Sequence, residues 1–111
     1  MAGRRKQWQE FKKKYPEFEK NKAFKADLGP MLDKYEQITK SLMNNAGELH
    51  YLLKDRVKLV RSIIAALSGY EVIVKHMSAT DKSIKSDFEN VLDGEFFENR
   101  LKIDEDRLGG L

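Results

Sequence analysis

Apolar residues recur at alternating steps of four and three residues through the middle of the chain, over residues 28–77. At this spacing the side chains share one face of an α-helix and the pattern repeats every seven residues. Only Thr39 and Arg56 in the series are clearly polar, so it predicts long amphipathic helix with coiled-coil-like packing. We call the series the heptad stripe; its members are Leu28, Leu32, Tyr35, Thr39, Leu42, Ala46, Leu49, Leu53, Arg56, Val60, Ile63, Leu67, Tyr70, Val74 and Met77.

Further apolar residues flank the stripe and widen it, namely Met31, Ile38, Leu52, Val57, Leu59, Ile64 and Ile73. A wide stripe packs against more than one neighbouring helix. The sequence therefore predicts an all-α fold in which long amphipathic helices form a helical hairpin or a bundle. Residues 70–74 also have high β-propensity, but they keep the helical phase, so we expect helix there.

A break in this helical region is expected at residues 44–47, where the sequence reads Asn-Asn-Ala-Gly. Asn45 and Glu48 have the spacing of a capping box at the start of a second helix. The alternative is one continuous helix, because the heptad phase passes through the site unchanged. Such a helix from Pro30 would be roughly 70 Å long at about 1.5 Å per residue, and it would have to oligomerise to cover its apolar face.

The N-terminal segment carries its own apolar face. Trp8, Phe11, Tyr15 and Phe18 are spaced three, four and three residues apart, which predicts a helix that Pro16 splits or kinks. Pro30 suits the first turn of the next helix. We therefore assign residues 1–27 to a basic, aromatic N-terminal helical arm and residues 28–77 to the long amphipathic core.

Residues 78–111 are expected to form a short helix and an acidic C-terminal tail. Residues 78–81 suit a loop and helix cap, and Gly94 suits the C-terminal cap of the helix that follows. The tail itself contains enough apolar residues for one more helix. The expected apolar face of the short helix comprises Ile84, Phe88, Val91 and Leu92.

Charge is distributed unevenly along these 111 residues, 35% of which are charged. The formal net charge is +3 overall, but residues 1–25 hold nine Lys or Arg against three Glu. Residues 78–111 hold five basic and nine acidic side chains. The chain thus has a basic head and an acidic tail. The tail either recognises a partner, neutralises the basic head of a neighbouring copy, or is simply solvated.

The sequence offers little for catalysis or cofactor binding. It has no cysteine, and its two histidines, His50 and His76, are 26 residues apart without a plausible co-ligand. No nucleophile motif or phosphate-binding glycine pattern occurs, and the carboxylates of residues 104–106 suggest a solvated helix face. We expect no enzyme activity, no metal or cofactor and no small-molecule substrate.

The expected location is the cytoplasm or another intracellular site, a virion included. No apolar core follows Arg4, Arg5 and Lys6, so we expect no classical secretion signal. The longest uncharged apolar stretch near the centre, residues 62–70, is shorter than the roughly 20 residues that span a bilayer.

The basic head is a candidate nucleic-acid-binding arm, because Lys and Arg attract phosphates and aromatic rings stack on unpaired bases. The alternative is that the aromatic side chains dock on the protein's own core while the charges stay solvated. The candidate nucleic-acid-binding residues are Arg4, Arg5, Lys6, Trp8, Lys12, Lys13 and Lys14.

The leading functional hypothesis is a non-enzymatic structural or assembly protein that self-associates or joins a larger complex, such as a virion, connector, scaffold or accessory component. The alternatives are a small DNA- or RNA-binding protein that uses the arm and a helical inhibitor or adaptor. Arg56 either pairs with an acid and sets register or extends to solvent. The candidate interface residues are Leu42, Leu49, Leu53, Arg56, Val60, Ile63, Leu67 and Tyr70.

Overall fold

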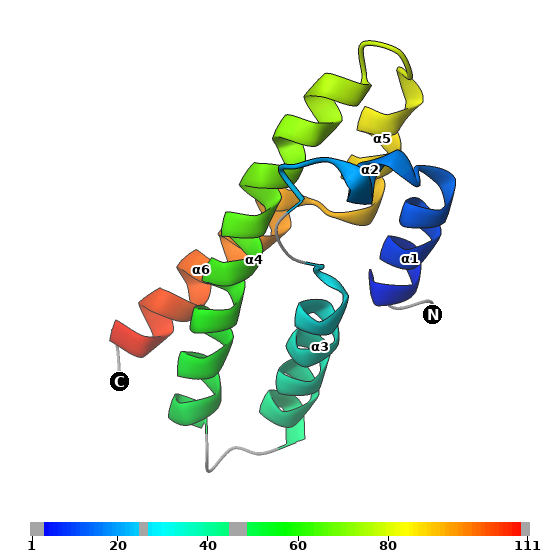
Figure 1. Ribbon diagram of the computed structural model, residues 1–111. Coiled ribbons are helices and arrows are strands. Elements are labelled where there is room, and N and C mark those ends of the chain that lie inside the picture. Colours follow the sequence, from blue (N-terminus) through cyan, green and yellow to red (C-terminus); the bar gives the residue numbers. More distant parts are fainter. Residues whose placement is uncertain (1–3, 25–26, 45–48, 110–111) are drawn as a thin grey trace.

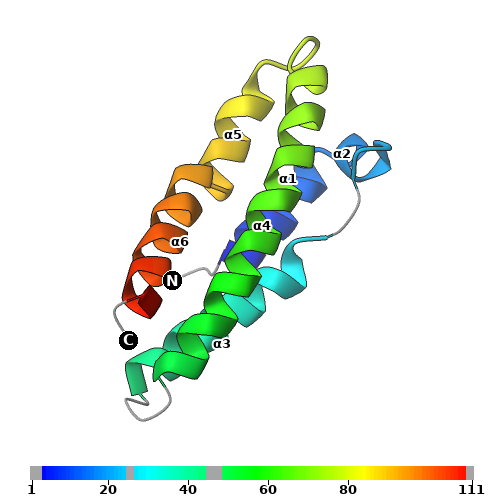
Figure 2. The same cartoon turned by 90° about the vertical axis from the view of Figure 1, so that its left-hand side faces the viewer.

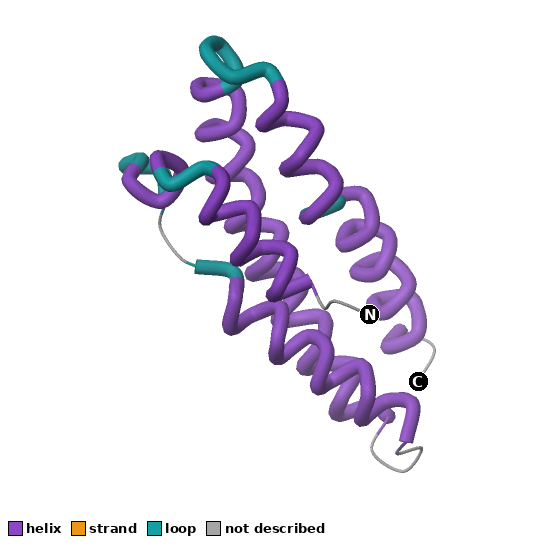
Figure 3. Tube along the Cα trace, turned by 90° about the vertical axis from the view of Figure 1, so that its right-hand side faces the viewer, coloured by secondary structure: helices purple, strands orange, loops and turns teal. Residues whose placement is uncertain are grey.

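The computed structural model describes residues 4–24, 27–44 and 49–109. Within these ranges there is no strand, and short loops join the helices (Figure 3). The fold is all-α, as predicted. In chain order the helices are α1 (Arg4–Lys14), α2 (Glu17–Lys20), α3 (Gly29–Asn44), α4 (Leu49–Met77), α5 (Ser83–Val91) and α6 (Gly94–Gly109).

The long helix α4 runs through the centre of a bundle that measures 50 × 26 × 21 Å (Figure 1). Helix α3 packs along one side of α4, and α5 and α6 return antiparallel along the other (Figure 2). Helix α1 lies against α3 and α5. The N-terminal arm is therefore an integral part of the bundle.

The helix boundaries follow the sequence signals. Pro16 separates α1 from α2, and Pro30 lies in the first turn of α3. The Asp27 carboxylate accepts a hydrogen bond of 2.9 Å from the Gly29 amide and so caps α3. Helix α3 ends at Asn44 and α4 begins at Leu49, and the expected turn and capping-box residues 45–48 lie outside the described residues.

The heptad stripe forms the core of a single chain. Its members in α4 pack against α3, α6 and the aromatic side chains of the N-terminal arm. Burial of each apolar member contributes about 1.5–3 kcal/mol to the stability of the fold. Residues 70–74 are helical, as expected. The fully or almost fully buried α4 members of the stripe are Leu53, Arg56, Val60, Ile63, Leu67, Tyr70 and Val74.

The aromatic face of the N-terminal arm packs into this core. Trp8 has no exposed surface, and its ring stacks on Tyr70 of α4 with the centroids 5.2 Å apart. Phe18 meets the same Trp8 ring edge-on at 5.7 Å. The indole N–H of Trp8 donates a 2.7 Å hydrogen bond to the Asp27 carboxylate, which satisfies its one buried polar group.

Two expectations for the C-terminal third were wrong. Gly94 does not cap α5: Leu92 is extended and ends that helix, and Gly94 is the first residue of α6. The Asp93 carboxylate accepts a 3.0 Å hydrogen bond from the Glu95 amide, so a new helix starts where a stop was expected. The acidic tail is consequently a 16-residue helix, and its Asp104 is fully buried instead of solvated.

A search of the described helices for a stretch long and apolar enough to cross a membrane found no such stretch.

Candidate functional site

The basic residues of the N-terminal arm are largely engaged within the protein. Arg5 pairs with Asp33, and Lys12 pairs with Asp27 at 2.6 Å. The guanidinium of Arg4 lies 4.3 Å from the centroid of the Phe96 ring, a cation–π contact with α6. These contacts tie α1 to α3 and to the C-terminal helix.

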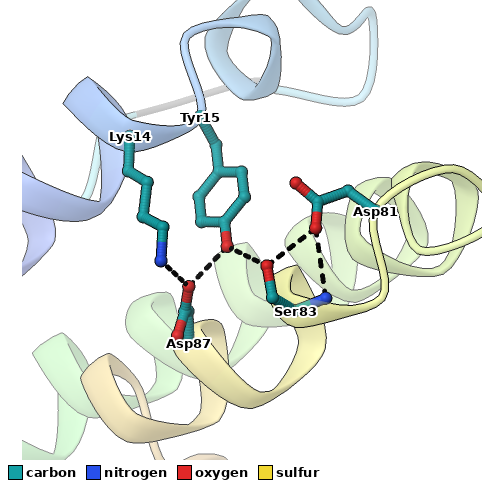
Figure 4. Close-up of polar contacts among 5 residues, drawn as sticks. All are labelled: Lys14, Tyr15, Asp81, Ser83 and Asp87. Carbon is teal, nitrogen blue, oxygen red and sulfur yellow. Dashed lines mark hydrogen bonds and ion pairs between the residues drawn. The ribbon is translucent and has the colours of Figure 1, made fainter.

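A polar cluster joins the end of α1 to α5 (Figure 4). The Lys14 ammonium lies 2.7 Å from the Asp87 carboxylate, which also accepts a hydrogen bond from the Tyr15 hydroxyl. The Tyr15 and Ser83 hydroxyl oxygens are 2.9 Å apart, and Ser83 donates to Asp81 at 2.7 Å. We call residues 14, 15, 81, 83 and 87 the arm clamp.

The arm clamp alters the acid–base properties of its members. Hydrogen bonds from Lys14 and Tyr15 lower the pKa of Asp87, and the same carboxylate raises the pKa of Lys14. Burial raises the pKa of Tyr15, and its hydrogen bond to Asp87 adds to this rise. The ionised Asp87 and Lys14 and the neutral Tyr15 are therefore the forms that hold the arm.

Asp27 links three parts of the arm. Burial alone would raise the pKa of Asp27, but hydrogen bonds from Lys12, the Gly29 amide and Trp8 outweigh it and lower that pKa. A single carboxylate thus satisfies the indole of the core and caps the next helix.

The structure separates the residues predicted to bind nucleic acid. Trp8 lies in the core, where it offers no face for a base to stack on. Arg4, Arg5, Lys12 and Lys14 contact the protein's own side chains, as given above. Lys6 and Lys13 are exposed, and neither has an ion pair within 4.0 Å among the described residues.

The residues predicted to form an oligomer interface lie mainly inside one chain. Leu53, Val60 and Ile63 have no exposed surface, and Leu67 and Tyr70 have almost none. Leu42 is half-buried near the end of α3. The side chain of Leu49 lies outside the described residues. The stripe therefore has an intramolecular partner along most of its length.

A hollow of about 780 Å³ lies between α4, α5 and α6. Its walls are formed by residues 71, 74 and 75 of α4 and residues 85, 88 and 89 of α5, and it is completed by Ser78 after α4 and by residues 92–95 and 98 around the start of α6. We call it the α4–α5 groove. Its volume is within the range of roughly 300–1,000 Å³ typical of binding pockets.

The break between α5 and α6 shapes one wall of this groove. α6 continues almost in line with α5 past the extended Leu92 (Figure 2). Val74, Phe88 and Leu92 line the groove, and each is less than a tenth exposed. These side chains belong to the protein's own core and leave little apolar surface at the base of the groove.

Acidic side chains dominate the groove's rim. Five carboxylates line it against two lysines, Lys75 and Lys85. All five carboxylates are exposed, and none has an ion pair within 4.0 Å among residues 4–24, 27–44 and 49–109. Asp93 also caps α6, and the other four carboxylates belong to Glu71, Glu89, Glu95 and Glu98.

The described residues assemble no metal centre. They contain no group of three or more His, Asp or Glu side chains placed to hold a metal ion. His50 and His76 are both exposed and occupy opposite ends of α4.

Sequence reasoning missed the α4–α5 groove, although its parts were visible. The acidic excess of residues 78–111 was recognised, but the pairing of α5 with α4 was needed to bring Glu71 beside Glu89 and Glu95. The available signal was Asp93 followed by Gly94 and Glu95, a helix start that follows the apolar face of α5.

Comparison of this chain with protein-family models, curated proteins and solved structures gave no match.

Proposed function

We propose that this protein is a non-enzymatic helical adaptor or assembly factor that binds a protein partner in the α4–α5 groove. The observation that carries the proposal is the burial of Val60, Ile63 and Tyr70 inside one chain. With the heptad stripe covered internally, the α4–α5 groove is a concave surface that remains open to a partner.

Two other hypotheses rank lower on specific contacts. Self-assembly through the heptad stripe requires the bundle to open and expose side chains that are now fully buried. Nucleic-acid binding by the arm is weakened because Arg5, Lys12 and Lys14 are each paired with a carboxylate of the protein itself.

The first test is the mass in solution by light scattering after size exclusion, at about 0.15 M and about 1 M salt. We expect a 12.9 kDa monomer at both concentrations, without excess absorbance at 260 nm. An oligomer that persists at high salt would favour assembly through the stripe. Excess 260 nm absorbance that high salt removes would favour nucleic-acid binding.

The second test places a photo-crosslinking amino acid at position 89 in the groove, and at position 106 on the exposed side of α6 as a control. We expect one stoichiometric partner to crosslink from position 89 alone, and Glu98→Lys to abolish that product. Equal crosslinking from both positions would contradict the proposal.

A further inference from the structure

We infer that the α4–α5 groove binds a lysine- or arginine-bearing amphipathic helix of a partner protein, an inference that rests on the proposed function. The groove combines a hollow of about 780 Å³ with a rim on which five carboxylates outnumber two lysines. Each of these features selects a different property of the partner.

The shape of the groove fits a helix. Its walls are α4 and α5, which run antiparallel, and a third helix that lies along them would complete a three-helix arrangement. Val74, Phe88 and Leu92 close the base of the groove, but each is less than a tenth exposed, so apolar side chains of the partner at i and i+3 or i+4 spacing would gain only a small contact there. Because so little apolar surface remains, the charges of the rim would carry most of the recognition.

The charge of the rim fits a cationic partner. Asp27, Asp87 and Asp104 elsewhere in the protein already pair with its own cations. Glu71, Glu89, Glu95 and Glu98 have no ion pair within the described ranges, so a partner's cations would find them available. Such complementarity steers association and sets specificity more than it adds affinity.

The charges are also segregated along the groove, which gives it a direction. Lys75 and Lys85 lie in the last turn of α4 and the first turn of α5, at the loop end. Glu95 and Glu98 lie in the first turns of α6, at the opposite end. The partner's basic residues should therefore concentrate toward α6, with a neutral or acidic residue near the two lysines.

A second copy of this chain fits the groove less well. Its most basic element, α1, has Arg5, Lys12 and Lys14 paired internally, which leaves Lys6 and Lys13 without an ion pair within 4.0 Å among the described residues. Two exposed ion pairs contribute only about 0–1 kcal/mol each. We therefore assign the groove to a different protein.

The test uses two synthetic helical peptides of about 14 residues that share one apolar stripe, about four helical turns. One carries Lys at its polar positions and the other carries Glu. Each is titrated into the isotopically labelled full chain by NMR. We expect the Lys peptide alone to shift the amides of residues 71, 89, 95 and 98, and we expect its affinity to fall at about 1 M salt.

Matched charge-reversal variants locate the binding site. Glu89→Lys together with Glu98→Lys should weaken the Lys peptide at least about tenfold. Asp106→Lys, on the exposed side of the same helix α6, should leave its affinity within about twofold. Well-dispersed amide spectra of all variants would show that each retains the fold.

Three results would overturn the inference: equal binding of the Glu peptide, equal weakening by Asp106→Lys, or groove shifts on dilution of the protein alone, which would indicate a second copy. The proposed function fails separately, if light scattering shows an oligomer held by the stripe. If the protein is a monomer that crosslinks a partner from position 89 but does not bind the Lys peptide, only the inference of a cationic partner helix is refuted.

Discussion

The guanidinium of Arg56 donates two hydrogen bonds to the carboxylate of Asp104, one of 2.7 Å from Nε and one of 2.9 Å from Nη2. Both side chains are buried, and they join the N-terminal third of α4 to the C-terminal half of α6. Thr39 of α3 accepts a third hydrogen bond from Arg56 at 3.3 Å. The two polar members of the heptad stripe thus contact each other and the acidic helix.

Removal of one partner of this pair should strongly destabilise the protein. Asp104→Ala leaves the buried Arg56 charge uncompensated, which costs about 3–5 kcal/mol of unfolding free energy in comparable pairs. Urea unfolding followed by circular dichroism measures the loss. The control is Glu105→Ala, which removes the exposed Arg61–Glu105 pair and should cost about 1 kcal/mol or less. Equal losses in the two variants would show that burial of the Arg56–Asp104 pair has no special role.

The Arg56–Asp104 pair shows which features of the structure could be predicted from the sequence and which could not. The heptad stripe predicted the all-α fold, and Arg56 stood out because it interrupts an apolar face. Its pairing with an acid, one of two interpretations, is confirmed. Asp104 could not be found in the same way, because the side of α6 that meets α4 depends on packing 48 residues away in the chain.

The single tryptophan should report that the arm is docked. Trp8 is fully buried among aromatic rings, so its emission should be blue-shifted and poorly quenched by acrylamide until the protein unfolds. Trp8→Ala should cost about 3–5 kcal/mol, because it removes a large buried ring. Ready quenching in the native protein, or a cost below 1 kcal/mol, would contradict a docked arm.

Gly69 should tolerate a methyl group but not a larger side chain. A Cβ atom at this position would lie 3.3 Å from the backbone oxygen of Ala23, so the loop after α2 approaches α4 closely here. For Gly69→Ala, the gain in helix propensity of up to about 1 kcal/mol should roughly offset this tight contact. Gly69→Leu should destabilise by about 1–3 kcal/mol, because the side chain must displace the loop.

Gly94 provides the matched control in thermal or urea unfolding. A Cβ atom added at Gly94 would have the side chain of Leu67 as its nearest neighbour, at 4.0 Å. Gly94→Ala should therefore stabilise the protein by about 0.5 kcal/mol. If Gly69→Leu were as well tolerated as Gly94→Ala, the close approach of Ala23 would be wrong.

The candidate site was less predictable than the fold. The aromatic spacing of the arm was read correctly, and the alternative in which its rings dock on the core is confirmed by the burial of Trp8 and Phe18. Charge counts alone could not reveal that Lys12 meets Asp27 or that Lys14 meets Asp87, 73 residues away. Local composition gives the sign of a segment's charge, whereas the fold decides which charges remain available to a partner.

The arm clamp should make stability depend on pH in the acid range. Lys14 and Tyr15 lower the pKa of Asp87 in the folded state, whereas the unfolded chain has a pKa of about 3.9. The stabilisation is therefore fully present above about pH 4 and is lost as the pH falls through the lower, folded pKa. We expect the difference in unfolding free energy between the wild type and Asp87→Asn to be largest near pH 6 and to shrink below about pH 3. Tyr15→Phe, which keeps the Lys14 pair, should retain part of the acid dependence. A difference that did not change with pH would show that the ionised Asp87 does not hold the arm, and that apolar packing of the aromatic rings alone does so.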